Sequence, residues 1–277
     1  MITAVRAWRE RGAQVGCAAR HIAHGLFDAL SELGAVRMAP PRDEREAAHR
    51  LAGVLCAVGK AHGLQVTVRG ELPRSPALVV ANHVSYLDPL AILPVCPALP
   101  IAKGEIVGWP IVGSIADALG VTFVRRADGM ARVRALRHVD KLLSRGVSVL
   151  NFAEGTTTDG LYARPFWRGT FGVAQRLGVP VVPVALRYKD PDIAWFDQAT
   201  FMPHYLRTAT RPAIEVELEF GAPLRPRTGE APEDFAARTR NIINRTLTRW
   251  NHAGLRDRVS PSRSNTVVPS ARVSRAS

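Results

Sequence analysis

The stretch ALVVANHVSYLDP, residues 77–89, joins a short apolar run to a polar turn. The run at 77–81 has the length and composition of a strand that is buried on both faces of a sheet. His83, Ser85 and Asp88 follow it directly. In open α/β sheets, ligands bind beyond the carboxyl ends of the strands. The stretch therefore predicts a buried strand that leads into a functional site.

Helical and strand patterns alternate on both sides of this stretch. Apolar periodicity and chain breakers predict helices over 5–33, 43–62, 128–144, 170–177 and 232–250, and strands over 64–68, 147–152, 181–186 and 214–220. This order predicts an α/β fold with a mixed sheet flanked by helices. We expect an amino-terminal helical segment (1–41), a central domain (42–255) and a disordered basic carboxy-terminal tail (256–277).

Two of the expected strands carry features of a sheet edge. Pro180 and Pro183 lie around the strand at 181–186, and proline suits an edge or a pocket wall better than a hydrogen-bonded sheet centre. The strand at 214–220 places Glu215, Glu217 and Glu219 on one face. This alternation favours an edge strand with one wet side.

Composition is that of an ordinary globular protein, but the charge is not. Of 277 residues, 47% are hydrophobic and 22% are charged, which excludes a disordered or fibrous chain. The 37 Lys and Arg residues against 24 Asp and Glu give a net charge of +13. This balance indicates anionic partners such as nucleic acid, an anionic membrane surface or phosphorylated small molecules. The longest uncharged run near the middle, 89–102, contains four prolines, so no transmembrane helix is expected.

Both ends of the chain are basic. In the amino-terminal helix, Val15, Ala19, Ile22, Leu26, Ala29 and Leu30 recur at helical spacing. That face fits either a membrane surface or the protein's own core. The segment 256–277 holds five arginines and one aspartate among Ser and Pro, and it either touches an anionic surface or is an inert solvated end.

Cysteine usage predicts a reducing, cytoplasmic compartment. Cys17, Cys56 and Cys96 are odd in number, far apart and outside any Cys/His cluster. This argues against a disulfide framework and against a zinc site, so no metal is expected.

His83 and Asp88 are the candidate catalytic residues. Histidine is the natural base for taking a proton from an alcohol near neutral pH, and a carboxylate can hold its tautomer. Five residues on a regular helix would leave the two side chains about 140° apart, so pairing requires His83 at or before a helix start. The alternative is structural, with Asn82 or Ser85 as a helix cap and Asp88 as a turn former.

Two further segments follow expected strands and suit an anionic ligand. The run at 120–126 ends in Arg125 and Arg126, of which one would face the site and could grip a phosphate. Residues 152–160 contain Glu154, Gly155 and Thr156 in a loop whose backbone N–H groups could approach an anion. Solvated surface arginines and a plain turn are the alternatives.

Together these segments resemble the glycerolipid acyltransferase superfamily, typified by 1-acyl-sn-glycerol-3-phosphate acyltransferase. Its four blocks are similar to NHVSYLD (82–88), FVR (123–125), FAEGT (152–156) and VVPV (181–184), in family order. The resemblance spans about 66–184 and also covers AKGE (102–105) and WPIVG (109–113). Each block alone is weak, whereas the ordered set is specific.

The resemblance implies transfer of a fatty acyl group from acyl-CoA or acyl carrier protein to a lysolipid hydroxyl, without a cofactor. It implies His83 as general base, Asp88 as its orienting partner, and Arg125, Glu154, Gly155 and Thr156 in acceptor binding. The expected product is phosphatidate, made from 1-acylglycerol-3-phosphate in phospholipid biosynthesis. The expected location is the cytoplasmic face of an anionic membrane, with peripheral attachment.

The third block departs from the phosphatidate-forming pattern. Those members typically have Pro before the Glu and a basic residue after Gly-Thr, where this chain has Ala153 and Thr157. The run EGTTTDG (154–160) instead resembles bacterial acyltransferases acting on lyso-ornithine lipid, so both acceptors remain open. A basic module that binds a membrane or, less favoured, nucleic acid without catalysis is the alternative from another class.

Overall fold

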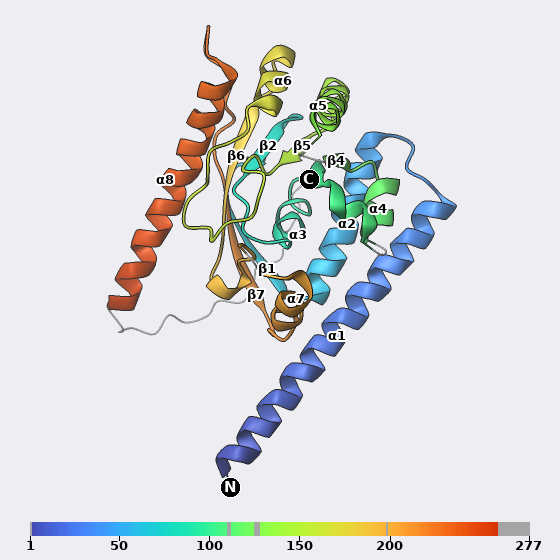
Figure 1. The fold of residues 1–277 in the computed structure, drawn as a ribbon, viewed down its shortest axis with the longest axis vertical. Coiled ribbons are helices and arrows are strands. Elements are labelled where there is room, and N and C mark those ends of the chain that lie inside the picture. Colours follow the sequence, from blue (N-terminus) through green and yellow to red (C-terminus); the bar gives the residue numbers. More distant parts are fainter. Residues whose placement is uncertain (1, 110–111, 125–127, 198, 260–277) are drawn as a thin grey trace, which may run out of the picture.

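The computed structural model describes residues 2–109, 112–124, 128–197 and 199–259 (Figure 1). Its helices are α1 (Ile2–Met38), α2 (Glu44–Ala61), α3 (Asp88–Ile92), α4 (Val112–Ala118), α5 (Gly129–Ser144), α6 (Gly169–Leu177), α7 (Phe201–Ala209) and α8 (Pro232–Val259). Two short 3-10 helices are η1 (Gly104–Gly108) and η2 (Pro191–Ile193). The strands are β1 (Leu64–Gly70), β2 (Leu78–Ala81), β3 (Leu99–Lys103), β4 (Thr122–Val124), β5 (Val149–Asn151), β6 (Val181–Tyr188) and β7 (Ile214–Phe220).

The strands form one seven-stranded sheet in the order β1-β7-β6-β2-β5-β3-β4. Every neighbouring pair is parallel except β6 and β7, which are antiparallel. The expectation of an α/β fold with a mixed sheet is therefore confirmed. Because β2, β5 and β6 run in the same direction, the residues after them meet at one edge of the sheet.

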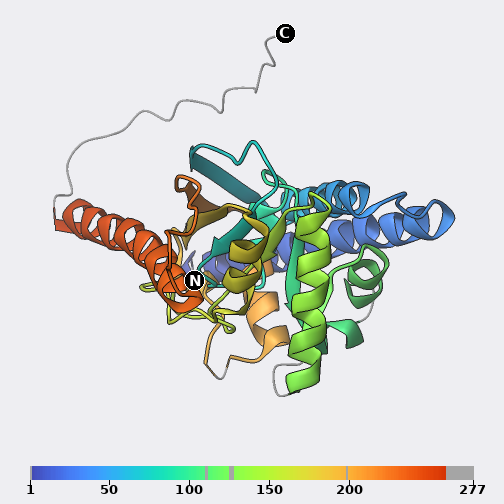
Figure 2. The ribbon, with the colours of Figure 1, turned by 90° about the horizontal axis from the view of Figure 1, so that it is seen from above.

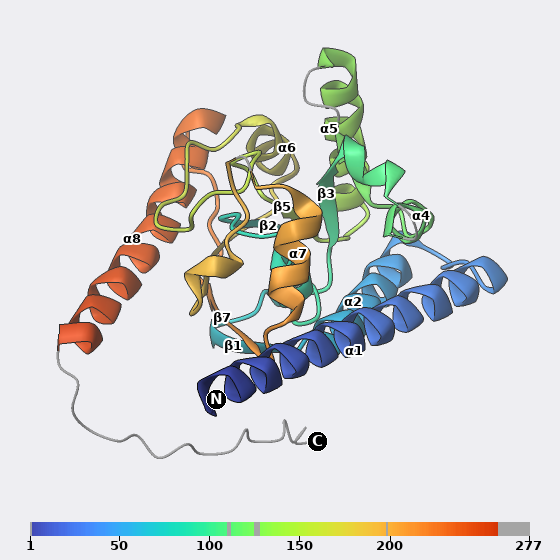
Figure 3. The same ribbon diagram turned by 60° about the horizontal axis from the view of Figure 1, so that its bottom comes forward.

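Helices cover both faces of the sheet. On one side α5, α6 and α8 pack against one another and against β4, β5 and β6 (Figure 2). On the other side α2 packs on β1, β3 and α3, and the long helix α1 lies across α2, α4 and α7 (Figure 3).

The central strand β2 lies in the core, as its apolar run predicts. Leu78, Val79, Val80 and Ala81 are all fully buried. Asp43 caps α2 by accepting a hydrogen bond from the backbone N–H of Glu46, and the expected helix at 43–62 ends as predicted, at a C-cap on His62. The buried strand and the capped helix fix where the polar turn after β2 emerges.

The strand β6 is an interior strand, so the edge expected from its prolines is wrong. It pairs with β2 on one side and β7 on the other. Pro183 is tolerated because the ladder to β7 begins only at Val184. The Pro183 carbonyl accepts from Gly221 N, so its ring nitrogen faces the side where that ladder has ended.

The strand β7 is also interior, which corrects the second expected edge. β1 covers it in parallel register from Leu64 opposite Ile214 to Gly70 opposite Phe220. Its glutamates face cations from neighbouring strands and from α8. Arg69 and Arg187 both pair with Glu217, Lys189 pairs with Glu215, and Arg249 pairs with Glu219. Ion pairs with these cations therefore accompany the glutamates, of which Glu217 is buried and Glu215 stays exposed.

The two ends of the described chain are helical. The amino-terminal helical segment is a single helix, α1, up to Met38. α8 continues to Val259, past the expected start of the tail at residue 256, and residues 260–277 lie outside the described part of the chain. Within the described residues, no helix is both long and apolar enough to cross a membrane.

Candidate active site

The turn after β2 brings His83 and Asp88 into contact. The side chain of Asn82 fixes the start of this turn, because its amide exchanges hydrogen bonds of 2.9 and 2.8 Å with the backbone of Leu186 on β6. His83 lies beyond the strand, and Asp88 is the first residue of α3. His83 Nδ1 lies 2.7 Å from Asp88 Oδ2. The pair therefore forms with His83 before the helix start, as the five-residue spacing requires.

Both carboxylate oxygens of Asp88 accept hydrogen bonds. Its side chain is fully buried, and its oxygens accept from the backbone N–H groups of Val84 (2.7 Å) and Ser85 (3.1 Å) and from the hydroxyl of Tyr188 (2.8 Å). A carboxylate that only accepts makes His83 Nδ1 the donor, which leaves a lone pair on Nε2. That nitrogen makes no hydrogen bond to the described residues, and the side chain is 20% exposed.

Residues that follow β5 hold the rest of His83. Its imidazole stacks on the Phe152 ring with centroids 4.1 Å apart. Its backbone N–H donates to Glu154 Oε1 at 2.7 Å, and its carbonyl accepts from Thr158 N at 2.8 Å. Glu154 in the third sequence block and Thr158, two residues beyond that block, thus fix both backbone polar groups of the candidate base. The ring is held by Phe152 and Asp88, and its Nε2 has no hydrogen-bond partner among the described residues.

Glu154 acts as a clamp between two loops. Its second oxygen, Oε2, accepts from Arg164 N at 2.7 Å. Burial raises the pKa of Glu154 to about 7, although the hydrogen bonds from Arg164 and His83 oppose that rise. Both oxygens are engaged by the backbone, so Glu154 shapes the site by positioning His83.

The remaining expected acceptor residues have different outcomes. Gly155 is buried and adopts φ +80°, a left-handed conformation that glycine permits without strain. Thr156 is exposed at the rim of the same loop. Arg125 lies outside the described residues. The structure therefore brings His83, Asp88 and Glu154 into contact, and Gly155 follows Glu154 in the same loop.

Sequence reasoning missed Tyr188 and Thr158 as partners of the pair. Thr158 holds the His83 carbonyl with its N–H and its hydroxyl, and Tyr188 donates to Asp88. A polar residue at the end of a strand parallel to β2 is the signal that could have pointed to Tyr188. The strand expected at 181–186 ends two residues before it.

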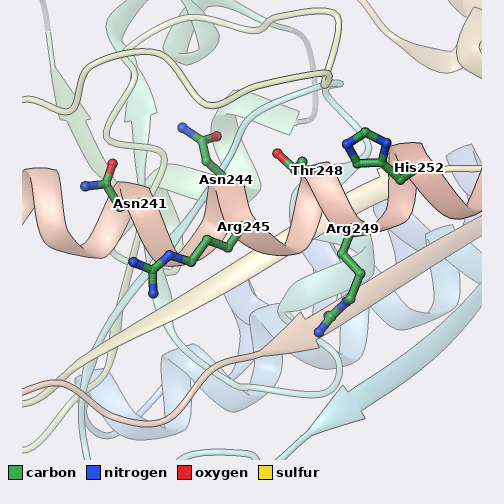
Figure 4. Close-up of a pocket in the computed structure, with 6 residues that line it drawn as sticks. All are labelled: Asn241, Asn244, Arg245, Thr248, Arg249 and His252. Carbon is green, nitrogen blue, oxygen red and sulfur yellow. The ribbon is translucent and has the colours of Figure 1, made fainter.

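A shallow groove of about 490 Å³ lies on α8, away from this pair (Figure 4). Its lining is polar and basic and comprises Asn241, Asn244, Arg245, Thr248, Arg249 and His252. None of these side chains contacts His83 or Asp88. Asn244 has a structural task, because its amide bonds the backbone N–H and C=O of Ala163. α8 thereby anchors the loop that supplies Arg164 N to Glu154.

Comparison with known proteins defines the class. The family model described as Acyltransferase matches residues 64–187. This range includes His83, Asp88 and the residues that contact them, except Tyr188. A lyso-ornithine lipid O-acyltransferase of Brucella abortus is 32% identical over 66% of this chain and 75% of its own length. The chain belongs to the acyltransferase family.

Two further proteins are similar to this chain in sequence or in fold. A lyso-ornithine lipid O-acyltransferase of Pseudomonas aeruginosa is 40% identical over 49% of this chain, and the match spans about half (51%) of that relative. The crystal structure of the 1-acyl-sn-glycerophosphate (LPA) acyltransferase PlsC from Thermotoga maritima superposes with a TM-score of 0.65 at 21% identity. It covers 87% of this chain and 98% of that structure, so the two share a fold.

Proposed function

We propose that this protein is an O-acyltransferase that moves a fatty acyl group from a thioester to the hydroxyl of a lysolipid. The observation that carries the proposal is the contact of 2.7 Å between His83 Nδ1 and the buried Asp88 carboxylate, with Nε2 left without a partner among the described residues. The family and the four ordered sequence blocks support the same chemistry.

In the proposed reaction, His83 Nε2 removes the proton from the acceptor hydroxyl as its oxygen attacks the thioester carbonyl. Asp88 keeps Nδ1 protonated and stabilises the imidazolium that forms. A tetrahedral oxyanion results, with a new C–O bond. It collapses by breaking the C–S bond, and the departing thiolate takes the proton from His83. The ester and the free thiol leave, so no acyl-enzyme is required.

We infer lyso-ornithine lipid as the preferred acceptor and lysophosphatidate as its competitor. A phosphate monoester carries up to two negative charges, whereas an ornithine headgroup carries one carboxylate and an amine. Thr157 stands where phosphatidate-forming members have a cation, so this part of the site offers less charge to a phosphate. The similarity to two lyso-ornithine lipid acyltransferases supports the same choice.

The test is an acyl-transfer assay with the purified full chain. Radiolabelled acyl-CoA or acyl-acyl carrier protein is combined with lyso-ornithine lipid or 1-acylglycerol-3-phosphate, and lipid products are separated. We expect diacylated ornithine lipid to form faster than phosphatidate, and no product with the His83→Ala variant. Faster formation of phosphatidate would reverse the acceptor assignment. Absence of product from either acceptor with either donor would overturn the proposed function.

We also propose peripheral attachment to the cytoplasmic face of an anionic membrane through α1. The helix packs on the protein with Cys17, His21, Gly25, Leu33 and Val36. Its neighbouring face leaves Val15, Leu26, Phe27 and Leu30 exposed, which includes three of the six positions expected to be an apolar face. An exposed apolar stripe on a chain of net charge +13 fits an anionic lipid surface.

Vesicle sedimentation tests this attachment. The Phe27→Gln/Leu30→Gln variant should bind vesicles of phosphatidylglycerol and phosphatidylcholine less tightly, while Val133→Gln on α5 should bind like wild type. Removal of 256–277 should weaken binding at low salt and have less effect at high salt. Unchanged binding by the α1 variant would contradict the proposed surface.

A further inference from the structure

Tyr188 approaches the candidate catalytic pair from the far side of Asp88. It is the last residue of β6 and is buried. Its hydroxyl lies 2.8 Å from Asp88 Oδ1. An ionised carboxylate can only accept, so the phenol donates. This places a hydrogen-bond donor on Oδ1, the oxygen of Asp88 that does not contact the histidine ring.

The two oxygens of Asp88 divide their contacts. Oδ2 accepts from His83 Nδ1 and from Val84 N, both at 2.7 Å. Oδ1 accepts from Tyr188 and, at 3.1 Å, from Ser85 N, which is equally close to Oδ2. A donor on Oδ1 stabilises negative charge there and leaves the carboxylate a weaker partner for an imidazolium on Oδ2.

Tyr188 keeps its proton throughout the range in which the enzyme would work. Burial, together with the nearby charge of Asp88, raises the pKa of the Tyr188 phenol well above its ordinary value. The phenol is therefore a constant donor and does not titrate with the base. Its influence on His83 is the same at every pH in that range.

We propose that Tyr188 is a positioning residue that holds Asp88 in place and sets the pH below which the rate of acyl transfer falls. The inference rests on the proposed roles of His83 and Asp88. Without the phenol, the Asp88 carboxylate attracts the imidazolium more strongly, so the acid limb of the pH profile should move to higher pH.

The other titratable groups around the pair do not share this contact. Glu154 faces His83 from the loop after β5, and its oxygens bond the backbone of His83 and Arg164. Tyr86 in the turn after β2 directs its hydroxyl to His204. Neither the Glu154 carboxyl nor the Tyr86 hydroxyl forms a hydrogen bond with Tyr188. Removal of the Tyr188 hydroxyl therefore changes the Asp88 contact alone.

The experiment is the pH profile of kcat/KM for wild type and Tyr188→Phe, measured as thiol release from the thioester. The variant should lose half of its rate at a pH higher by on the order of one unit, because a hydrogen bond to a charged group is removed. The rate on the plateau at higher pH should fall by less than about tenfold. A profile that falls equally at every pH, with an unmoved acid limb, would overturn the inference.

The matched control is Tyr205→Phe. Tyr205 also donates its hydroxyl to a buried partner, but that partner is His62, 2.9 Å away. Its acid limb should coincide with that of wild type. The His83→Ala variant distinguishes failure of the proposed function from failure of the role of Tyr188. If His83→Ala keeps its activity, the proposed function fails. If His83→Ala is inactive and the acid limb of Tyr188→Phe does not move, only the role of Tyr188 fails.

A second variant makes the test independent of folding. Site-specific replacement of Tyr188 by 3-fluorotyrosine keeps the shape of the ring and makes the phenol a stronger donor. The acid limb should then move to lower pH, opposite to the change in Tyr188→Phe. An acid limb that stays in place, or moves upward, with fluorotyrosine would contradict the inference even if Tyr188→Phe did not fold.

Discussion

Two groups of histidines in this protein differ in the partners of their ring nitrogens. His83 has a carboxylate on Nδ1 and no hydrogen-bond partner on Nε2 among the described residues. His62 instead donates from Nδ1 to the Val58 carbonyl at 2.8 Å and accepts from Tyr205 at 2.9 Å. His204 likewise contacts carbonyls with Nε2 and hydroxyls with Nδ1.

This difference separates His83, a candidate general base, from His62, which has a structural role. Both nitrogens of His62 are occupied by neutral groups, and burial lowers the pKa of His62, so the ring stays neutral and joins α2 to α7. Gly25 on α1 lies so close to this ring that a Cβ atom would come within 2.7 Å of it. His62 therefore forms part of the surface on which α1 packs. His83 has the carboxylate and the open nitrogen that proton transfer requires.

The largest expected effect is the loss of rate in His83→Ala. A general base contributes about 10²–10⁴-fold, so we expect thioester-dependent acyl transfer to fall by about 10³-fold, or about 4 kcal/mol of transition-state stabilisation. His62→Gln, which changes a buried histidine of the other group, should keep its rate within a few-fold of wild type. Comparable losses in both variants would erase the distinction between the two groups.

The next effect is on stability and comes from Glu154. The carboxyl has a pKa near 4.5 when unfolded and about 7 in the fold, because burial disfavours its charge. Between these values the folded state holds a proton that the unfolded state has released. Its stabilising contribution is therefore complete below pH 4.5 and is lost as the pH rises through about 7. At 1.36 kcal/mol per pH unit the loss is about 3 kcal/mol.

Denaturant unfolding of Glu154→Gln at several pH values measures this contribution. Glutamine cannot ionise, so the stability of wild type relative to the variant should fall by about 3 kcal/mol from pH 4.5 to pH 8. Glu105→Gln, at an exposed position, should show a constant difference. If the Glu154 difference were also independent of pH, this carboxyl would not hold its proton in the fold.

The smallest effect is expected in the second histidine group. His62→Gln should lose about 1 kcal/mol at pH 7.5, the net value of a hydrogen bond. Because the folded pKa of His62 lies below its ordinary value of 6.5, wild type loses stability as the pH falls through that range. The deficit of the variant should therefore shrink at pH 5.5. Thermal unfolding would show this, with the exposed His24→Gln as control, and a deficit that grew on acidification would contradict it.

The sequence carried much of the fold because the decisive signals were local. The apolar run at 77–81, the Asp43 cap and the spacing of His83 and Asp88 each concern residues close in the chain. The interior position of β7 depends instead on β1, which pairs with it across about 150 residues, and β6 is interior because β7 covers its other side. Nothing within 214–220 indicates that Arg69, Arg187 and Arg249 would neutralise its glutamates.

The candidate site was predictable to the same extent. Residue types and order indicated His83, Asp88 and the Glu154 loop, but they did not indicate what each contact does. Both carboxylate oxygens of Glu154 accept from backbone N–H groups, and Tyr188 donates to Asp88, which lies 100 residues away in the sequence. Such contacts follow from sheet register, which local pattern does not specify. The role expected for Arg125 stays a prediction, because that residue lies outside the described part of the chain.

A double-mutant cycle on His83 and Asp88 tests whether the two side chains act as one pair in catalysis. The rate of thiol release with acceptor present is compared for wild type, His83→Ala, Asp88→Asn and the double variant, with folding checked by thermal unfolding. If Asp88 acts only through the imidazole, the double variant is as slow as His83→Ala alone. Losses that multiply in the double variant, or a His83→Ala variant as fast as wild type, would contradict the pairing.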